Sequence, residues 1–230
     1  MADADLWRDM EDALASYGPV LHADTSRDDT ISAMAHRALA QVPNSSILVG
    51  FSMGGYVARE IARLAPDRVS ALVLVATSAR GDTADQARRK AAAASQTAAS
   101  GRFAGLSRSV VASSLHPDRA NDDALVSRIQ AMAVRLGPGV FRRQSLMLRE
   151  GDLATLGEVR CPTLVIAGRQ DRLLSIAEAE ELRTGINGSE LLVIEGVGHM
   201  IPVEAPGDLV GAMAPWLERL PPLAPHTGVG

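Results

Sequence analysis

Residues 47–55 read ILVGFSMGG, an apolar run of strand length that enters a Gly-x-Ser-x-Gly turn. Glycines at positions 50 and 54 suit a tight strand-to-helix turn, because side chains there would collide with the nearby backbone. Such a turn holds the serine in a strained conformation and presents its hydroxyl at the carboxyl edge of a sheet. We therefore expect Ser52 to be a nucleophile. The N–H of Met53, at the start of the following helix, is expected to stabilise an oxyanion.

Strands and helices alternate on both sides of this turn. Apolar runs and alternation predict strands at residues 20–23, 47–51, 69–75, 163–167 and 191–194. Helical spacing of apolar residues predicts helices at 1–18, between Asp29 and Pro43, and at 54–64, 176–183 and 209–217. Five strands separated by helices predict an α/β fold with a mostly parallel sheet covered by helices on both faces.

The alternation stops between residues 81 and 150. Alanine-rich stretches at 86–100, 124–136 and 141–149 follow one another as predicted helices without a strand. We interpret residues 81–150 as a helical cap inserted into a core of residues 1–80 and 151–220, with 221–230 as a flexible tail. Within the cap, Arg88, Arg89 and Lys90 are expected to lie on one solvated helix face.

A serine nucleophile needs a base, and the base needs a carboxylate that fixes its tautomer. Asp171 follows the strand at 163–167, and His199 follows the last strand on a glycine-rich loop. The carboxyl ends of parallel strands share one edge, where functional residues collect. The predicted triad is therefore Ser52, Asp171 and His199, in the chain order Ser, Asp, His.

Other residues compete for these roles. Glu195 and Glu204 lie close to His199 in sequence, but Glu204 is better interpreted as a helix cap or surface residue ahead of Pro206. The remaining histidines are expected to be structural or solvated. They are His22 on a predicted strand, His36 in a helix, His116 before a proline, and His226 in the tail.

Composition and charge argue against several classes of function. Lys and Arg total 23 against 27 Asp and Glu, and this net charge of −4 gives no reason to expect nucleic-acid or anionic-membrane binding. No apolar run approaches the roughly 20 residues that span a bilayer. The single cysteine, Cys161, excludes an internal disulfide, and no metal-ligand spacing, phosphate loop or dinucleotide motif is present. The sequence predicts a cytoplasmic protein without cofactor or metal that acts on a small molecule.

The chain resembles the α/β-hydrolase superfamily in residues 50–55, in GRQD at 168–171, and in GH at 198–199. CPT at 161–163, before a strand, is also typical of these proteins. The similarity is to esterase-like and enol-lactonase-like members with a helical cap, and it extends over roughly residues 3–218. It implies acyl transfer to water through an acyl-enzyme on Ser52. A lactonase, thioesterase, carbon–carbon hydrolase or perhydrolase shares this triad, and a catalytically silent binding protein is a further alternative.

Members of that superfamily normally begin with further strands, one of which leads to a loop with a second oxyanion donor. In this sequence the fold is expected to be N-terminally shortened, with a strand absent between residues 20–23 and 47–51. Three explanations are open: a start at an internal methionine, direct pairing of these two strands, or pairing with a second copy in a homodimer. We also expect residues 1–3 to reach the oxyanion region.

The substrate is expected to be a small or medium, largely apolar ester. Phe51 lies beside the nucleophile and is a candidate substrate contact. Apolar residues of the predicted cap are the other candidates: Phe103, Leu106, Val110, Leu115, Phe141 and Met147.

Overall fold

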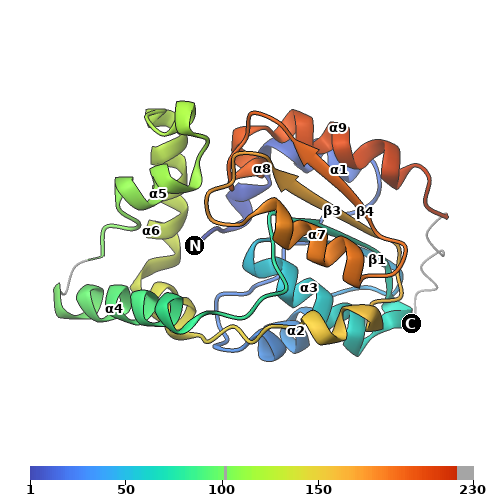
Figure 1. Ribbon diagram of the computed structural model, residues 1–230, viewed down its shortest axis with the longest axis horizontal. Coiled ribbons are helices and arrows are strands. Elements are labelled where there is room, and N and C mark those ends of the chain that lie inside the picture. The colour runs from blue at the N-terminus through green and yellow to red at the C-terminus, as the bar shows by residue number, and fades with distance from the viewer. Residues whose placement is uncertain (101–102, 222–230) are drawn as a thin grey trace.

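The computed structural model describes residues 1–100 and 103–221, and its centre is a parallel β-sheet. The strands are β1 (Ser46–Phe51), β2 (Val69–Val75), β3 (Thr163–Gly168) and β4 (Glu190–Ile194), paired in that order. Each joins the next in parallel register, with Phe51 opposite Val75 and Gly168 opposite Ile194. The predicted α/β fold is confirmed (Figure 1).

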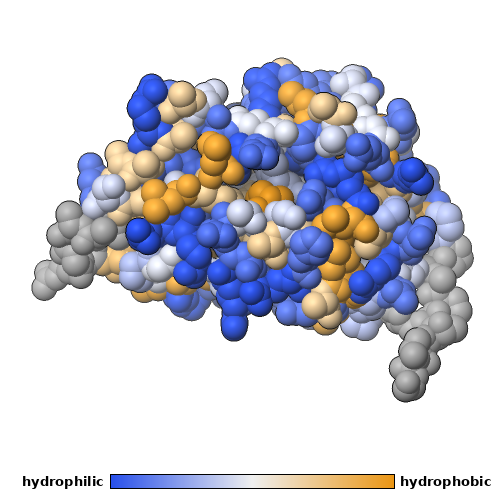
Figure 2. All heavy atoms as spheres, turned by 90° about the horizontal axis from the view of Figure 1, so that it is seen from below, coloured by the Kyte–Doolittle hydropathy of each residue, from blue (hydrophilic) through white to orange (hydrophobic). Residues whose placement is uncertain are grey.

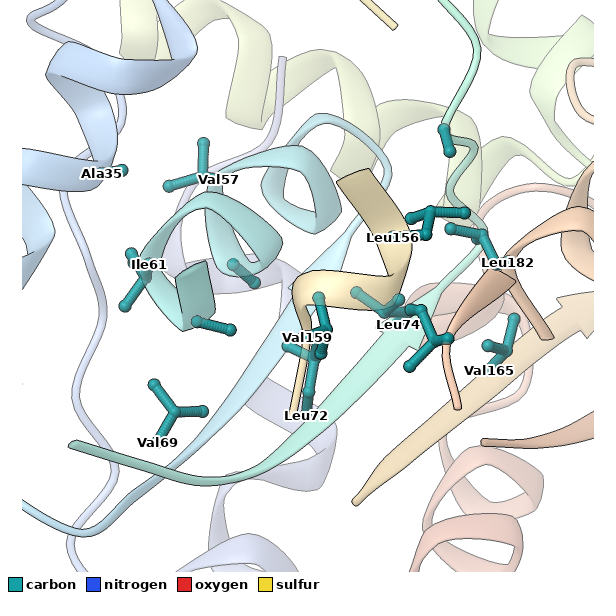
Figure 3. Packing of buried hydrophobic residues seen from close by; sticks show 14 of the residues in the cluster. Ala35, Val57, Ile61, Val69, Leu72, Leu74, Leu156, Val159, Val165 and Leu182 are labelled. Carbon is teal, nitrogen blue, oxygen red and sulfur yellow. The ribbon is translucent and has the colours of Figure 1, made fainter. Parts of the chain in front are cut away.

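Helices cover both faces of the sheet (Figure 1). One face packs against α2 (Ile31–Leu39), α3 (Met53–Leu64) and α7 (Ile176–Gly185), and the other against α1 (Glu11–Ala15) and α9 (Pro206–Leu217). Successive residues of a strand point to opposite faces. Leu72 and Leu74 accordingly pack towards Val57 and Ile61 of α3 (Figure 3), while Val73 and Val75 pack towards α9. The uninterrupted apolar run of β2 follows from this burial on both faces.

A group of helices lies beside the sheet, at the left of Figure 1. It comprises α4 (Ala84–Ser100), α5 (Arg108–Ser114), the short 3₁₀ helix η4 (Pro117–Arg119) and α6 (Asp123–Leu146). Helix α6 is kinked at Gly137, whose φ of 79° and ψ of 176° are not helical, and Pro138 follows. The two helices predicted at 124–136 and 141–149 are thus the two arms of α6, but the second arm ends at Leu146. Helix α5 was not predicted.

The N-terminal predictions are wrong in two respects. The expected helix at 1–18 is broken into two 3₁₀ helices, η1 (Ala4–Leu6) and η2 (Arg8–Met10), followed by the short α1. Residues 20–23 form no strand, because Leu21, His22 and Ala23 are all exposed and the alternating burial that stabilises a strand is lost. Among the described residues β1 is therefore an edge strand, and the expected gap inside the sheet does not occur.

The remaining elements are short. The 3₁₀ helices η3 (Pro66–Arg68) and η5 (Leu153–Glu158) lead into β2 and β3, and α8 (Ile201–Glu204) precedes α9. No helix in the described ranges combines the length and apolarity needed to cross a membrane. On the face shown in Figure 2, apolar side chains form separate patches among hydrophilic ones.

Candidate active site

Ser52 occupies a strained turn between β1 and α3. Its φ of 50° and ψ of −115° lie in a region that residues with a side chain rarely adopt. The turn is held by the Ser52 N–H, which donates to the Val75 carbonyl at 2.9 Å, and by the Thr77 hydroxyl, which donates to the Ser52 carbonyl at 2.7 Å. A Cβ at Gly50 would lie 2.6 Å from the carbonyl oxygen of Gly54, so only glycine fits there. The neighbouring backbone thus stabilises this strained conformation.

His199 and Asp171 converge on this serine. The Oγ of Ser52 lies 3.1 Å from Nε2 of His199, and Nδ1 of His199 lies 2.8 Å from Oδ2 of Asp171. The other carboxylate oxygen of Asp171 accepts from the N–H groups of Leu173 at 2.7 Å and Leu174 at 3.0 Å. With the imidazole proton on Nδ1 towards Asp171, Nε2 is free to accept a proton from Ser52.

Close backbone packing sets the position of the His199 loop. Gly168, at the end of β3, lies against the carbonyl groups of Val197 and Gly198, and a Cβ there would lie 2.8 Å from the Val197 oxygen. The N–H of His199 donates to the carbonyl of Ser114 in α5 at 2.9 Å. The loop that carries His199 is therefore held both by the end of β3 and by α5.

Glu204 is a residue whose role the sequence interpretation missed. It is not a surface residue or helix cap but is 8% exposed, and its carboxylate accepts from the N–H groups of His116 at 2.6 Å and of Gly198 and Met200 at 3.1 Å each. Burial raises the pKa of Glu204, and these backbone donors act in the opposite direction. Glu204 thus binds the backbone on both sides of His199 and links this loop to His116, which follows α5. The sequence signal for this role was the position of Glu204, an acidic residue five positions after His199.

Glu195, which competed with Asp171 for the role of the carboxylate that binds His199, does not lie at this site. Glu195 is exposed and pairs with Arg169 at 3.0 Å.

The side chains of the other described histidines do not join the series Ser52–His199–Asp171. His22, which is not on a strand, lies 3.3 Å from Glu11, His36 is exposed on α2, and His116 accepts from the N–H of Asp118 at 3.1 Å. His226 and most of the predicted tail lie outside the described residues.

Two cavities meet at Ser52 and His199. The larger, of about 810 Å³, is lined mainly by apolar residues, including Leu6, Leu106 and Val111. The smaller, of about 300 Å³, is lined by polar and basic residues together with Leu173 and Leu174. Leu173 also borders both cavities. A substrate could therefore extend in two directions from the serine.

The predicted substrate contacts divide into two groups. Phe51 lines the larger cavity with its ring centroid 5.1 Å from that of His199, and Leu106 and Val110 line it too. The four others are not among the residues lining either cavity. Phe103 and Phe141 pack on each other at 5.3 Å, Met147 lies in the core cluster of α2 and α3, and Leu115 is also buried. Their apolar character reflects packing.

Two backbone segments near Ser52 line the larger cavity. Met53 begins α3 and lines the larger cavity, as do residues 1–3. Arg135 of α6 binds Asp3 at 2.7 Å and Asp5 at 3.1 Å, which links the N-terminal segment to α6. Within residues 1–100 and 103–221, no three His, Cys, Asp or Glu side chains group as a metal site would require.

Comparison with known proteins identifies a family model, a relative and solved structures that share the α/β-hydrolase fold. Residues 11–206 match the family model described as alpha/beta hydrolase fold. The chain is 30% identical over 199 residues to a pimeloyl-[acyl-carrier protein] methyl ester esterase of Aromatoleum aromaticum, which covers 80% of this chain and 78% of the relative. A solved esterase from Thermogutta terrifontis is similar with a TM-score of 0.80 and 25% identity, over 95% of this chain and 86% of the other. The enol-lactonase of Burkholderia xenovorans shares the fold, with a TM-score of 0.79, 18% identity and coverage of 95% and 88%.

Proposed function

The chain belongs to the α/β-hydrolase fold family, and we propose that it is a serine esterase that cleaves carboxylic esters through an acyl-enzyme on Ser52. The observation that carries the proposal is the hydrogen-bonded series from Ser52 through His199 to Asp171 at the meeting point of two cavities. The similarity to an esterase from Aromatoleum aromaticum supports an ester as the substrate class.

The proposed reaction begins with attack of Ser52 Oγ on the ester carbonyl. His199 Nε2 accepts the hydroxyl proton, and Asp171 stabilises the imidazolium that forms. The oxyanion of the tetrahedral intermediate accepts a hydrogen bond from the N–H of Met53. His199 then returns the proton to the leaving alcohol, and the acyl group remains on Ser52.

Water completes the cycle. His199 takes a proton from a water molecule, which attacks the acyl-enzyme, and the acid leaves as Ser52 regains its proton. One missing oxyanion donor typically costs about 10² to 10³ in rate. We propose that a backbone N–H of residues 1–3, which line the same cavity, supplies the second donor.

The substrate proposed for this site has a largely apolar portion. The larger cavity, with Phe51 at the nucleophile and Leu106 and Val110 on the cap side, fits a small or medium acyl or alcohol group. Apolar contacts of this kind contribute roughly 25 cal/mol per Å² of buried area. We therefore expect activity to rise with acyl-chain length until the cavity is filled.

The test is hydrolysis of p-nitrophenyl acetate, butyrate and octanoate by the wild-type chain and by Ser52→Ala. We expect turnover by the wild type and a loss of at least about 10³-fold in kcat for the variant, since the nucleophile is removed. Circular dichroism checks that both proteins are folded. Equal turnover by the two folded proteins would refute the proposal.

A further inference from the structure

The smaller cavity has a charge character that the ester reaction itself does not need. Its lining includes Ser52 and His199 together with Arg89, Lys90 and Arg149, and it includes no carboxylate among the described residues. Tyr56, Thr77, Ser78 and Gln86 add hydroxyl and amide groups. This lining contrasts with that of the larger cavity, although both open on the same serine.

Two of these cations share one buried carboxylate. The Asp82 side chain is fully buried and binds Lys90 at 2.7 Å and Arg149 at 2.7 Å. Lys90 also donates to the carbonyl of Met147 at 2.8 Å. One carboxylate neutralises only one of the two cations, so this part of the cavity wall keeps an excess positive charge.

The guanidinium of Arg149 is held in a fixed position. Asp82 binds Nε and Nη2 of its guanidinium, and the guanidinium carbon lies 5.7 Å from the centre of the Tyr56 ring. Such fixing lowers the conformational entropy that a ligand would have to remove. The Nη1 atom is the guanidinium donor that remains for a ligand.

Arg89 adds a second source of positive charge. It pairs with Asp85, the carboxylate that Arg88 also binds at 3.3 Å, so two cations again share one anion. Arg88 and Arg89 are neighbours on α4 with side chains 71% and 79% exposed, but only Arg89 lines the cavity. The two arginines therefore form a matched pair that differs in access to the site.

From these contacts we infer that the smaller cavity binds an anionic group of the substrate, a carboxylate or a phosphate, while the apolar arm of the same ester occupies the larger cavity. This inference rests on the proposed esterase function and specifies its substrate class: esters that carry an acidic group on one side of the scissile bond. A guanidinium binds carboxylate and phosphate oxygens through charge-assisted hydrogen bonds. The positive wall also attracts such substrates from solution.

The experiment compares monomethyl adipate, which carries a carboxylate, with methyl hexanoate, a neutral ester of similar length. Methyl 6-phosphooxyhexanoate is the phosphate-bearing third substrate. Methanol release gives kcat/KM for wild type, Arg89→Glu and Arg88→Glu. We expect the wild type to prefer at least one anionic ester, and the better of the two identifies the group that the cavity takes.

The variants test where the preference arises. An exposed charge pair contributes only a few-fold to affinity, and charge inversion replaces attraction by repulsion. We therefore expect Arg89→Glu to lower the ratio of anionic to neutral kcat/KM by about 3- to 10-fold, chiefly through KM. Arg88→Glu should change this ratio by less than about twofold, and 0.5 M NaCl should reduce the preference of the wild type by screening.

Each outcome has a distinct meaning. Equal kcat/KM for the neutral and both anionic esters, or equal ratios for the two variants, would overturn the anion site while leaving the esterase function intact. Failure to hydrolyse any of the esters, methyl hexanoate included, would count against the esterase function itself and against the inference that rests on it.

Discussion

Gly168→Ala should impair catalysis without touching a catalytic side chain. Gly168 ends β3, three residues before Asp171, and an added Cβ would lie 2.8 Å from the carbonyl oxygen of Val197 and closer still to that of Gly198. Both obstacles are backbone atoms of the loop that carries His199. Because φ of Gly168 is not positive, alanine can adopt the backbone conformation and the obstacle is contact alone.

The expected magnitude follows from this contact. Carbon and oxygen atoms need more than about 3 Å, so the loop has to move by about 0.5–1 Å. Displacement of a catalytic group by about 1 Å can cost about 10²-fold in rate. The Ser52–His199 distance of 3.1 Å leaves little room for such a shift. We expect kcat on p-nitrophenyl butyrate to fall about 10- to 100-fold, with a smaller change in KM.

The matched control is Gly211→Ala on α9, where an added Cβ meets nothing within 4 Å. It should keep full activity and be stabilised by roughly 0.5–1 kcal/mol, as expected when alanine replaces a glycine within a helix. Urea unfolding separates loss of fold from loss of geometry. If Gly168→Ala is folded and keeps kcat within threefold of wild type, backbone packing does not set the position of His199 and the reasoning is refuted.

Three further perturbations test other parts of the account. Asp171→Asn should lower kcat by about 10⁴-fold while the protein stays folded, because the imidazole loses the group that fixes its tautomer; activity within tenfold of wild type would contradict this. Glu204→Gln should lower kcat about 10-fold by weakening the hydrogen bonds around His199, and an unchanged rate would show that Glu204 does not position the loop. For Asp82, burial tends to raise the pKa, but hydrogen bonds from Arg149 and Lys90 outweigh it and hold the pKa at about 2, below the ordinary 3.8. The stabilisation that ionised Asp82 provides is present above pH 4 and is lost as pH falls through 2. Asp82→Asn should therefore lower the free energy of unfolding in urea by roughly 1–2 kcal/mol at pH 7 and by progressively less below pH 4. A loss that does not depend on pH would exclude this linkage.

The parts of the structure that were predictable are those in which local sequence carries the physical constraint. The run at 69–75 is apolar because β2 is covered on both faces. Gly50 is required by a close contact with the Gly54 backbone within the same turn, but the same expectation for Gly54 is wrong, because an added Cβ there would meet nothing within 4 Å. Asp171 and His199 could be placed near the serine because parallel strands bring their carboxyl ends to one edge.

The errors arose where long-range contacts decide the outcome. Residues 20–23 have apolar character but no neighbouring strand, so their backbone finds no pairing. Glu204 is buried because it meets the N–H of His116, which is 88 positions away. Lys90 was expected on a solvated face with Arg88 and Arg89, yet its ammonium group binds the buried Asp82. Local periodicity does not specify such partners.

The central claim is that Ser52 is an activated nucleophile, and intact-mass analysis after reaction with a fluorophosphonate tests it directly. We expect one adduct per chain, mapped to Ser52 by digestion, and none on Ser52→Ala under the same conditions. His199→Ala should label far more slowly, because the base that activates the hydroxyl is absent. Folded wild-type protein that remains unlabelled, or that labels at another residue, would contradict the account.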